Sequence, residues 1–297
     1  MVIFVSGGSG SGKSEFAEGL VTSSEFDDRT YIATMRVWDE EGRKRVERHR
    51  AMRKDKGFNT IECDVGLGKA DVNGGAVLLE DLTNLFMNEY FEPGGKNALS
   101  RVEADLLSLA GKCELLVIVG NDIFSAGDCL SGDMEGFYAA QGRLNAFAAA
   151  MADECWEVSA LQPKRMKAGE IKNMDGLKLI IGGAHQGKTA WASEKFDTGR
   201  GVADNIGDAE TADVFCALHQ WIKDEPSPIE KLDMLMEKNP DLAIVCNEMG
   251  CGVAPVDDAD RAWREKVGRT CCYLAEKADT VVRLWCGIPL ILKGKDK

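Results

Sequence analysis

The sequence predicts an α/β protein whose mostly parallel sheets are flanked by helices and arranged as two tandem, related units. Three observations carry this prediction. The pattern G-x-x-x-x-G-K-[ST], typical of phosphate-binding loops (P-loops), occurs twice, at residues 7–14 and 182–189. Each copy follows a short apolar run. Strand-like and helical segments alternate along the chain, which indicates parallel strands joined by right-handed crossovers. The expected fold is therefore P-loop NTPase-like.

The first loop follows the apolar run 2–5, which we expect to be a buried strand. Its glycines let backbone N–H groups surround a phosphate, and the next helix points its positive end at that phosphate. Lys13 is expected to reach the β- and γ-phosphates of a nucleotide, and Ser14 to bind Mg²⁺. The predicted nucleotide-binding loop consists of Gly7, Gly8, Ser9, Gly10, Ser11, Gly12, Lys13 and Ser14.

The second loop follows the apolar run 179–181, and its defining positions are Gly182, Gly187, Lys188 and Thr189. A duplicated loop can keep its sequence after losing its ligand. The sequence therefore leaves open whether this copy binds nucleotide. His185, inside this loop, and His219, further along the chain, are assigned no role.

Composition narrows the functional classes. The 297 residues suit two ordinary domains, and a net charge of −13 disfavours nucleic acid and anionic membranes as partners. The ten cysteines include no C-x-x-C pair, which argues against a zinc site or disulfide framework and favours a cytoplasmic location. No leader, membrane anchor or bound redox cofactor is expected.

Three pairs of landmarks repeat at a constant spacing of 126 residues. They are Asn121-Asp122 with Asn247-Glu248, Gly142-Arg143 with Gly268-Arg269, and Ala152-Asp153 with Ala278-Asp279. The two P-loop lysines are instead 175 residues apart, so the second copy is 49 residues shorter between its loop and its later strands. The halves are related in plan but unequal in content.

The shortened region predicts the unit boundaries. The first copy continues into a strand-like run at 30–34 and a charged segment, for which the second copy has no apparent counterpart. Residues 202–205 instead resemble residues 77–81. We expect a complete unit at 1–160, a linker at 161–176 and a shortened unit at 177–297.

A charged segment at 39–56 holds His49, with Arg45 and Arg53 four residues to either side on one helical face. An imidazole among guanidinium groups suits phosphate chemistry, because the cations bind phosphates and keep a nitrogen lone pair available. From the residues alone, a charged amphipathic helix with an incidental histidine is the favoured alternative.

Two further acids are candidates for the nucleotide site. Glu80 ends an apolar run where P-loop proteins place an acid near Mg²⁺, but capping of the next helix by Asp81 or Thr83 explains the same pattern equally well. Glu62, which lies shortly before the glycine-rich connection 66–75, is on its own a weaker candidate than Glu80. Both remain candidates at this point.

The chain resembles the bifunctional adenosylcobinamide kinase / adenosylcobinamide-phosphate guanylyltransferases of cobalamin biosynthesis. The resemblance rests on the form of the first loop and on four segments in the same order: Tyr31-Ile32-Ala33-Thr34, the stretch 45–50, Leu78-Leu79-Glu80 and the stretch 247–255. It covers nearly the whole chain as a tandem duplication with a shortened second copy.

The resemblance implies phosphorylation of adenosylcobinamide, followed by transfer of GMP from GTP through a guanylylated histidine, which by position is His49. Lys13 would serve the kinase step, and Mg²⁺ with GTP or ATP would bind at Ser14 and Glu80. The resemblance also implies that Thr34, Arg50, Arg53, Glu62 and Glu80 line the GTP site. The substrate loop would comprise Asn247, Glu248, Gly250, Gly252 and Pro255.

The chain departs from that pattern in each half. The first copy has Asn121-Asp122 without the glycine-rich continuation, and the second copy lacks a counterpart of His49. We therefore expect the halves to complement each other, as an internal pseudo-dimer or within a homo-oligomer. A different P-loop small-molecule kinase and a non-catalytic nucleotide- or corrinoid-binding protein are the alternatives.

Overall fold

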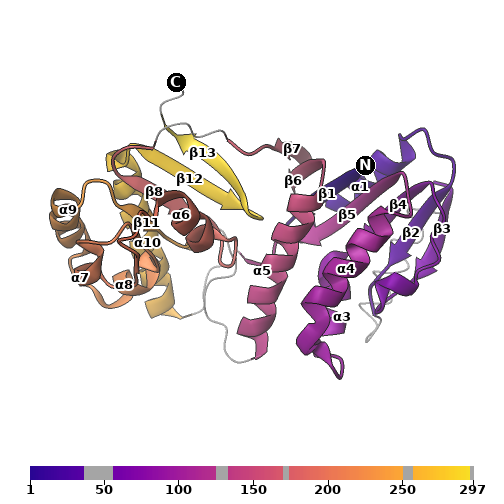
Figure 1. Ribbon diagram of the computed structural model, residues 1–297, viewed down its shortest axis with the longest axis horizontal. Helices are drawn as coiled ribbons and strands as arrows, with labels where there is room; N and C mark the ends of the chain where they lie inside the picture. The colour runs from indigo at the N-terminus through magenta and orange to yellow at the C-terminus, as the bar shows by residue number, and fades with distance from the viewer. Residues whose placement is uncertain (37–55, 125–132, 170–173, 250–256, 295–297) are drawn as a thin grey trace. The chain divides into compact units, whose positions relative to one another are not determined.

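The computed structural model describes residues 1–36, 56–124, 133–169, 174–249 and 257–294. The chain divides into two compact units, residues 1–123 with 133–166 and residues 124–132 with 167–297. Each unit contains one sheet and its flanking helices (Figure 1). No helix among the described residues is long and apolar enough to cross a membrane.

The sheet of the first unit has the strand order β3-β2-β4-β5-β1-β6-β7, and every neighbouring pair is parallel except β6 with β7. Its strands are β1 (Val2–Gly7), β2 (Arg29–Ala33), β3 (Phe58–Glu62), β4 (Ala76–Glu80), β5 (Leu115–Asn121), β6 (Glu154–Ser159) and β7 (Gln162–Met166). Its helical segments are α1 (Lys13–Thr22), η1 (Leu67–Lys69), α3 (Leu82–Phe91), η2 (Gly95–Asn97), α4 (Ala98–Ala110) and α5 (Asp133–Met151).

The end of the first unit differs from the prediction. Strand β7 lies inside the stretch 161–176 that the sequence indicated as a linker, and the first unit extends to Met166 rather than residue 160. Polar residues fill most of this edge strand, which therefore carries no strand-like apolar pattern.

Both faces of the first sheet are buried. Side chains of α1 pack with alternate residues of the strands, including Val5, Leu78 and Val117. The intervening residues, such as Phe4, Leu79 and Ile118, are also fully buried and point to the other face, because strand side chains alternate. Helices α3 and α4 lie in front of the sheet in the view of Figure 1. Continuous apolar strands of this kind are typical of parallel sheets covered on both sides.

The sheet of the second unit has the order β13-β12-β8-β11-β10-β9, in which only β12 and β13 pair antiparallel. Its strands are β8 (Lys178–Ile181), β9 (Val202–Ala203), β10 (Val214–Phe215), β11 (Ala243–Val245), β12 (Thr280–Trp285) and β13 (Ile288–Lys293). Its helices are α6 (Lys188–Phe196), α7 (Ile206–Ala209), α8 (Leu218–Asp224), α9 (Pro228–Lys238) and α10 (Asp258–Lys277).

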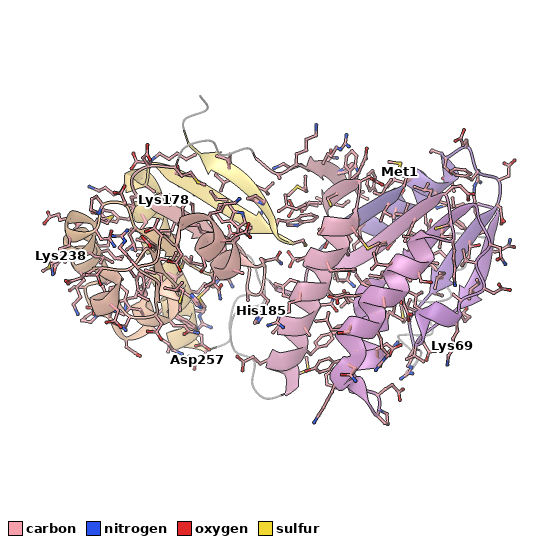
Figure 2. All side chains as sticks on the ribbon, in the orientation of Figure 1. Met1, Lys69, Lys178, His185, Lys238 and Asp257 are labelled. Carbon is pink, nitrogen blue, oxygen red and sulfur yellow. The ribbon has the colours of Figure 1, made fainter. Side chains whose placement is uncertain are left out.

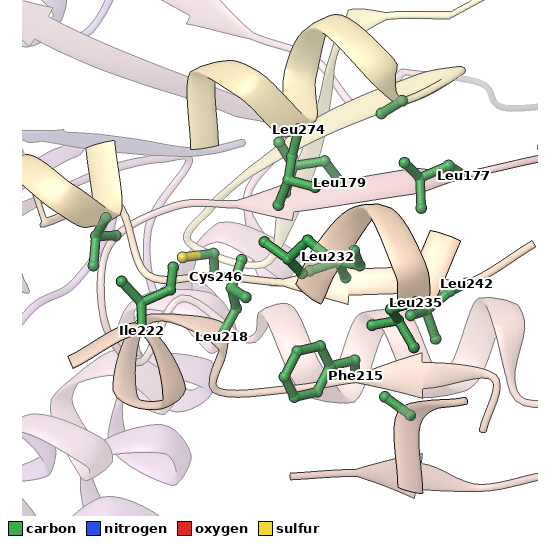
Figure 3. Close-up of a cluster of buried hydrophobic side chains, with 14 of the residues drawn as sticks. Leu177, Leu179, Phe215, Leu218, Ile222, Leu232, Leu235, Leu242, Cys246 and Leu274 are labelled. Atoms are coloured by element: carbon green, nitrogen blue, oxygen red, sulfur yellow. The ribbon is translucent and has the colours of Figure 1, made fainter. Parts of the chain in front are cut away.

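The second unit has its own apolar core. In Figure 3, Leu179, Phe215 and Leu232 lie in one cluster, to which β8, β10 and α9 each contribute. Cys246, which directly follows β11, is buried in the same cluster. A separate core of this size fits a unit that folds around its own sheet.

The order of the second sheet corrects one expectation. Strand β10 adjoins β11, as β4 adjoins β5, so β10 rather than the segment 202–205 corresponds to β4. Strand β9 takes the place of β2, although no counterpart of residues 30–34 was expected. The predicted match between residues 202–205 and residues 77–81 was wrong because β10 has only two residues. So short a strand leaves no recognisable apolar run in the sequence. Among the described residues, the second sheet ends at β9 and has no counterpart of β3.

A buried carboxylate shapes the short connection that leads into β9. Asp213 is 3% exposed and accepts hydrogen bonds from Thr198 N at 2.7 Å, Thr198 Oγ1 at 2.9 Å and Arg200 Nε at 2.7 Å. Burial alone would raise the pKa of Asp213, but the hydrogen bonds from Thr198 and Arg200 outweigh it and lower this pKa to about 2. The ionised carboxylate therefore stabilises the folded unit.

Replacing Asp213 by Asn should lower the free energy of unfolding by about 1–3 kcal/mol at pH 7, because charge-assisted hydrogen bonds are lost. Since the folded pKa lies below the unfolded one, this difference should shrink as the pH falls from about 4 to 2. Urea unfolding across this pH range measures it. Asp224→Asn, an exposed change of equal charge in the same unit, should have little effect. An unchanged stability of Asp213→Asn would contradict this account.

Candidate functional site

The first P-loop connects β1 to α1. Strand β1 is buried along its whole length, so the loop starts from a fixed point at the carboxyl end of the sheet. Gly12 precedes α1 with φ +91°, a conformation that favours glycine, and a Cβ at this position would lie 2.2 Å from Leu161 Cδ2. The tight turn directs backbone N–H groups toward one point above the helix. Such a loop is suited to bind a phosphate.

The side chain of Lys13 lies against the same loop. It is 8% exposed, and its Nζ donates to Gly8 O at 3.1 Å. A lysine held beside the amide groups of the loop supplies the positive charge that a polyphosphate requires.

Ser14 and Glu80 meet beside the loop, because the strands place their carboxyl ends level with one another. Val5 of β1 pairs with Val119 of β5, which pairs with Glu80 of β4. Ser14 Oγ donates a hydrogen bond to Glu80 Oε1. Burial raises the pKa of Glu80 to about 7, against the hydrogen bond from Ser14, which lowers it. A hydroxyl beside a carboxylate forms a pair of oxygen ligands of the kind that Mg²⁺ binds together with substrate phosphates.

Asp81 caps α3. Capping of this helix was the alternative explanation to an acid near Mg²⁺ at Glu80. Its Oδ1 accepts from Asn84 N at 2.6 Å, which caps α3, and its Oδ2 accepts from Asn121 Nδ2 at 3.1 Å. Burial raises the pKa of Asp81. Thr83 Oγ1 accepts from Asn121 N at 3.1 Å. Asp81 caps the helix while Glu80 contacts Ser14, so the two acids have different roles.

Thr34 and Glu62 lie farther from the loop. Thr34 is fully buried, and its Oγ1 accepts from Asp81 N at 2.7 Å and donates to Asp81 O at 2.8 Å. This arrangement positions the end of β4 and leaves the Thr34 side chain away from the surface. Glu62 ends β3 level with Glu80, with β2 between them, at roughly twice the 5 Å spacing of neighbouring strands. Its side chain is exposed at the sheet edge.

Several predicted site residues lie outside the described parts of the chain. They are His49, Arg50 and Arg53 of the first unit and Gly250, Gly252 and Pro255 of the second. Their assigned roles remain predictions.

The second P-loop repeats the geometry of the first. Gly187 precedes α6 with φ +83°, and Lys188 Nζ donates to Gly183 O, as Lys13 does to Gly8. The backbone also matches, because Glu248 N donates to Gly182 O at 2.8 Å and Asp122 N donates to Gly7 O at 3.0 Å. Figure 2 places His185 on this loop, where its side chain is exposed.

The second loop differs from the first in the residue that faces it from β10, which lies beyond β11 in the sheet. Ile180 pairs with Val245, and Phe215 pairs with the preceding residue, Ile244. The residue after Phe215 is Cys216, which therefore stands where the first unit has Glu80. Thr189, at the position of Ser14, is exposed. The pairing of hydroxyl and carboxylate in the first unit is thus not repeated.

His219 contributes to the second site, although no pattern in the sequence assigns it a role. Its Nδ1 lies 3.5 Å from Asn247 N, and its Nε2 lies 3.0 Å from Asn247 Nδ2. In the first unit, Thr83 makes the corresponding contact with Asn121 N. His219 therefore positions Asn247, the first residue of the predicted substrate loop. No local pattern signals this contact, because the two residues are 28 positions apart.

Glu248 forms an ion pair with Arg283, with Arg283 Nε 3.1 Å from Glu248 Oε2. In the first unit, the position that corresponds to Arg283 lies 126 residues earlier and is occupied by Glu157. The charge at this position is therefore reversed between the two units.

No cluster of three or more His, Cys, Asp or Glu side chains that could hold a metal ion occurs among the described residues. Mg²⁺ bound at Ser14 and Glu80 would need further ligands from phosphates and water, which is its usual manner of binding in phosphoryl-transfer sites.

The fold and the two loops place the chain in the P-loop class of α/β proteins. The model of the family described as "Cobinamide kinase / cobinamide phosphate guanyltransferase" matches residues 3–165 and 215–292. These segments make up more than half of the chain, which therefore belongs to this family.

Two curated relatives agree with the family assignment. The bifunctional adenosylcobalamin biosynthesis protein CobU of Escherichia coli (strain K12) is 33% identical over 175 residues, covering 53% of this chain and 95% of the relative. The protein of the same name from Salmonella typhimurium (strain LT2) is 30% identical with the same coverage. A solved structure, the flagellar accessory protein FlaH of Methanocaldococcus jannaschii, gives a TM-score of 0.28 at 10% identity over 56% of this chain and 75% of that chain.

The raised pKa of Glu80 predicts a change of stability with pH. The folded protein holds the Glu80 proton more tightly than the unfolded chain between pH 4.5 and about 7. As the pH rises through this interval, the free energy of unfolding of the wild type should therefore fall by roughly 1–3 kcal/mol relative to that of Glu80→Gln. Glu80→Gln mimics the protonated acid and so lacks this dependence. Urea unfolding at pH 5, 6, 7 and 8 measures the difference. Glu15→Gln, an exposed change on α1, should follow the wild type. Parallel curves for wild type and Glu80→Gln would disprove the raised pKa.

Proposed function

We propose that this protein phosphorylates adenosylcobinamide and then transfers GMP from GTP to the resulting phosphate, in the nucleotide-loop assembly of cobalamin biosynthesis. Membership of the cobinamide kinase / cobinamide phosphate guanyltransferase family supports the proposal. The single structural observation behind it is the first P-loop, where Lys13, Ser14 and Glu80 converge. We place the reaction in the cytoplasm.

In the kinase step, the substrate hydroxyl attacks the γ-phosphorus of ATP or GTP, and the nucleoside diphosphate leaves. Lys13 and the loop amides bind the phosphates and stabilise the charge that develops on them. Ser14 and Glu80 are suited to hold Mg²⁺, whose contribution is to neutralise phosphate charge. At a pKa of about 7, Glu80 can exchange a proton for the cation near neutral pH.

In the second step, a nitrogen of His49 attacks the α-phosphorus of GTP, and pyrophosphate leaves. A phosphate oxygen of adenosylcobinamide phosphate then attacks the same phosphorus, and the bond to His49 breaks. Arg50, Arg53 and Glu62 are proposed to hold the nucleotide during this exchange, and Thr34 to position the end of β4. The roles of Arg50, Arg53 and Glu62 rest on the family resemblance, and the role of Thr34 rests on its hydrogen bonds with Asp81.

One observation favours a non-catalytic role for the second unit alone. It has Cys216 at the position where the first unit has the carboxylate of Glu80. Catalysis by the first unit is compatible with it.

A covalent intermediate tests the proposal. The protein is incubated with Mg²⁺ and GTP labelled at the α-phosphate and then denatured, and bound label is measured. We expect acid-labile, base-stable label on the wild type and none on His49→Ala, because a phosphoramidate hydrolyses in acid. His185→Ala, which removes an exposed imidazole, should keep the label. Absence of label on the wild type would refute guanylyl transfer through a histidine and leave a simple kinase or a binding protein.

The contribution of the predicted substrate loop has a separate test. The double change Asn247→Ala and Glu248→Ala should lower kcat/KM for the corrinoid substrate by at least about tenfold, while label transfer from GTP to the protein persists. The matched change in the first unit, Asn121→Ala with Asp122→Ala, shows whether the effect is specific to the second unit. Unchanged kcat/KM after the Asn247 and Glu248 changes would disprove complementation between the halves.

A further inference from the structure

The second P-loop has no part in the function proposed above. It lies at residues 182–189, between the two segments matched by the family model. Its geometry is nevertheless maintained. Lys188 is only 6% exposed and its Nζ contacts a loop carbonyl, and Glu248 N ties the start of the loop to the end of β11. A loop held in this form can still present its amide groups to an anion.

Other contacts hold the far side of this loop. Gln186 is 5% exposed, and its Oε1 accepts a hydrogen bond from Cys286 N in the turn between β12 and β13. In the first unit, Leu161 N of the equivalent turn donates to Ser11 O at 2.8 Å. Both loops are therefore braced by a hairpin turn, which limits their freedom before any ligand binds.

The second loop lacks the carboxylate that the first loop has. Cys216 occupies the position of Glu80, and burial raises the pKa of its thiol. Glu248 is already paired with Arg283. Asp204 follows β9, which lies one strand farther from β8 than β10 does, or about 5 Å farther. The described residues thus place no available carboxylate where Glu80 lies in the first unit.

Positive charge is arranged differently around this loop. Arg283 pairs in register with Ile181, the last residue of β8, and so stands beside the start of the loop. Its counterpart in the first unit is Glu157. The second loop thus has Lys188 and an arginine whose Nε contacts Glu248 Oε2 nearby, where the first has Lys13 and a glutamate. Guanidinium groups bind phosphate oxygens without a metal ion.

We propose that the second P-loop is a polyphosphate site that binds without a divalent cation. Its ligand is the phosphate chain of a nucleoside triphosphate, or free pyrophosphate, held by the loop amides and Lys188 with Arg283 beside them. The first loop, in contrast, is expected to bind phosphates together with Mg²⁺, because Ser14 and Glu80 offer a pair of oxygen ligands beside it. This inference goes beyond the catalytic proposal and does not depend on it.

Binding measurements on the full chain test the inference. Lys13→Met disables the first loop but keeps most of the side-chain length in a buried position. Isothermal titration of this variant with pyrophosphate and with a non-hydrolysable GTP analogue should give one equivalent bound, with Kd values in Mg²⁺ and in EDTA that agree within about threefold. Binding of the analogue but not pyrophosphate identifies a nucleotide site, and binding of both identifies a site for the phosphate chain.

Adding Lys188→Met to this variant should weaken binding at least about tenfold. No binding to Lys13→Met, or binding only in the presence of Mg²⁺, would overturn the inference. The readout is equilibrium binding, so a failure to form labelled His49 would leave this result unaffected.

A gain of metal dependence provides the sharper test. In the Lys13→Met background, Cys216→Glu restores a carboxylate at the position of Glu80. Mg²⁺ should then strengthen binding of the GTP analogue by about tenfold. Cys216→Gln, which has the same shape without the charge, should show no effect of Mg²⁺. Equal behaviour of the two variants would contradict the assignment of Cys216 as the reason for metal independence.

Discussion

The register of three parallel strands is the constraint on which the first site depends. Because β1, β5 and β4 end level with one another, a carboxylate on β4 reaches a hydroxyl on the helix that follows β1. Burial of that carboxylate is unfavourable when it is charged, which explains the raised pKa of Glu80. Thr34, Asp81 and Asn121 form hydrogen bonds that fix the end of β4. The surrounding structure therefore maintains an electrostatically costly group at the position where a bound cation would offset its cost.

The second unit keeps the central strand order and changes the side chains beside its P-loop. Its strands β9 and β10 have two residues each, yet they place Cys216 level with the P-loop strand, as β4 places Glu80. The side chains at Cys216 and Arg283 thus distinguish the second loop from the first, which has Glu80 and Glu157 at these positions. In parallel sheets the carboxyl ends of the strands form the ligand-binding edge, so a change there alters binding without altering the fold.

Sequence patterns predicted the parts of the fold that have local signals. The P-loops, the apolar run that becomes β5 and the acid at the end of β4 were all identifiable, because glycine spacing and buried strands leave a clear pattern. Strand β7 was missed because its residues are mostly polar. The correspondence of β10 with β4 was missed because two residues carry no periodicity. Neither failure reflects an unusual local structure.

The candidate sites were only partly predictable for a different reason. Contact between Ser14 and Glu80 depends on strand register, and contact between His219 and Asn247 joins elements far apart in sequence. A spacing of 126 residues aligned the late landmarks of the two units, but it does not apply to the region before β11. Only the sheet order and the strand register show that Cys216 and Glu80 are equivalent.

The most direct test of this account locates the metal ion. Crystals of the full chain grown with Mn²⁺ and a non-hydrolysable GTP analogue would be measured at a wavelength where Mn²⁺ scatters anomalously. The account predicts one anomalous peak per chain, between Ser14 and Glu80, and phosphate density without a peak at the second loop. A peak beside Thr189, or none beside Ser14, would contradict the division between a metal-dependent and a metal-independent site.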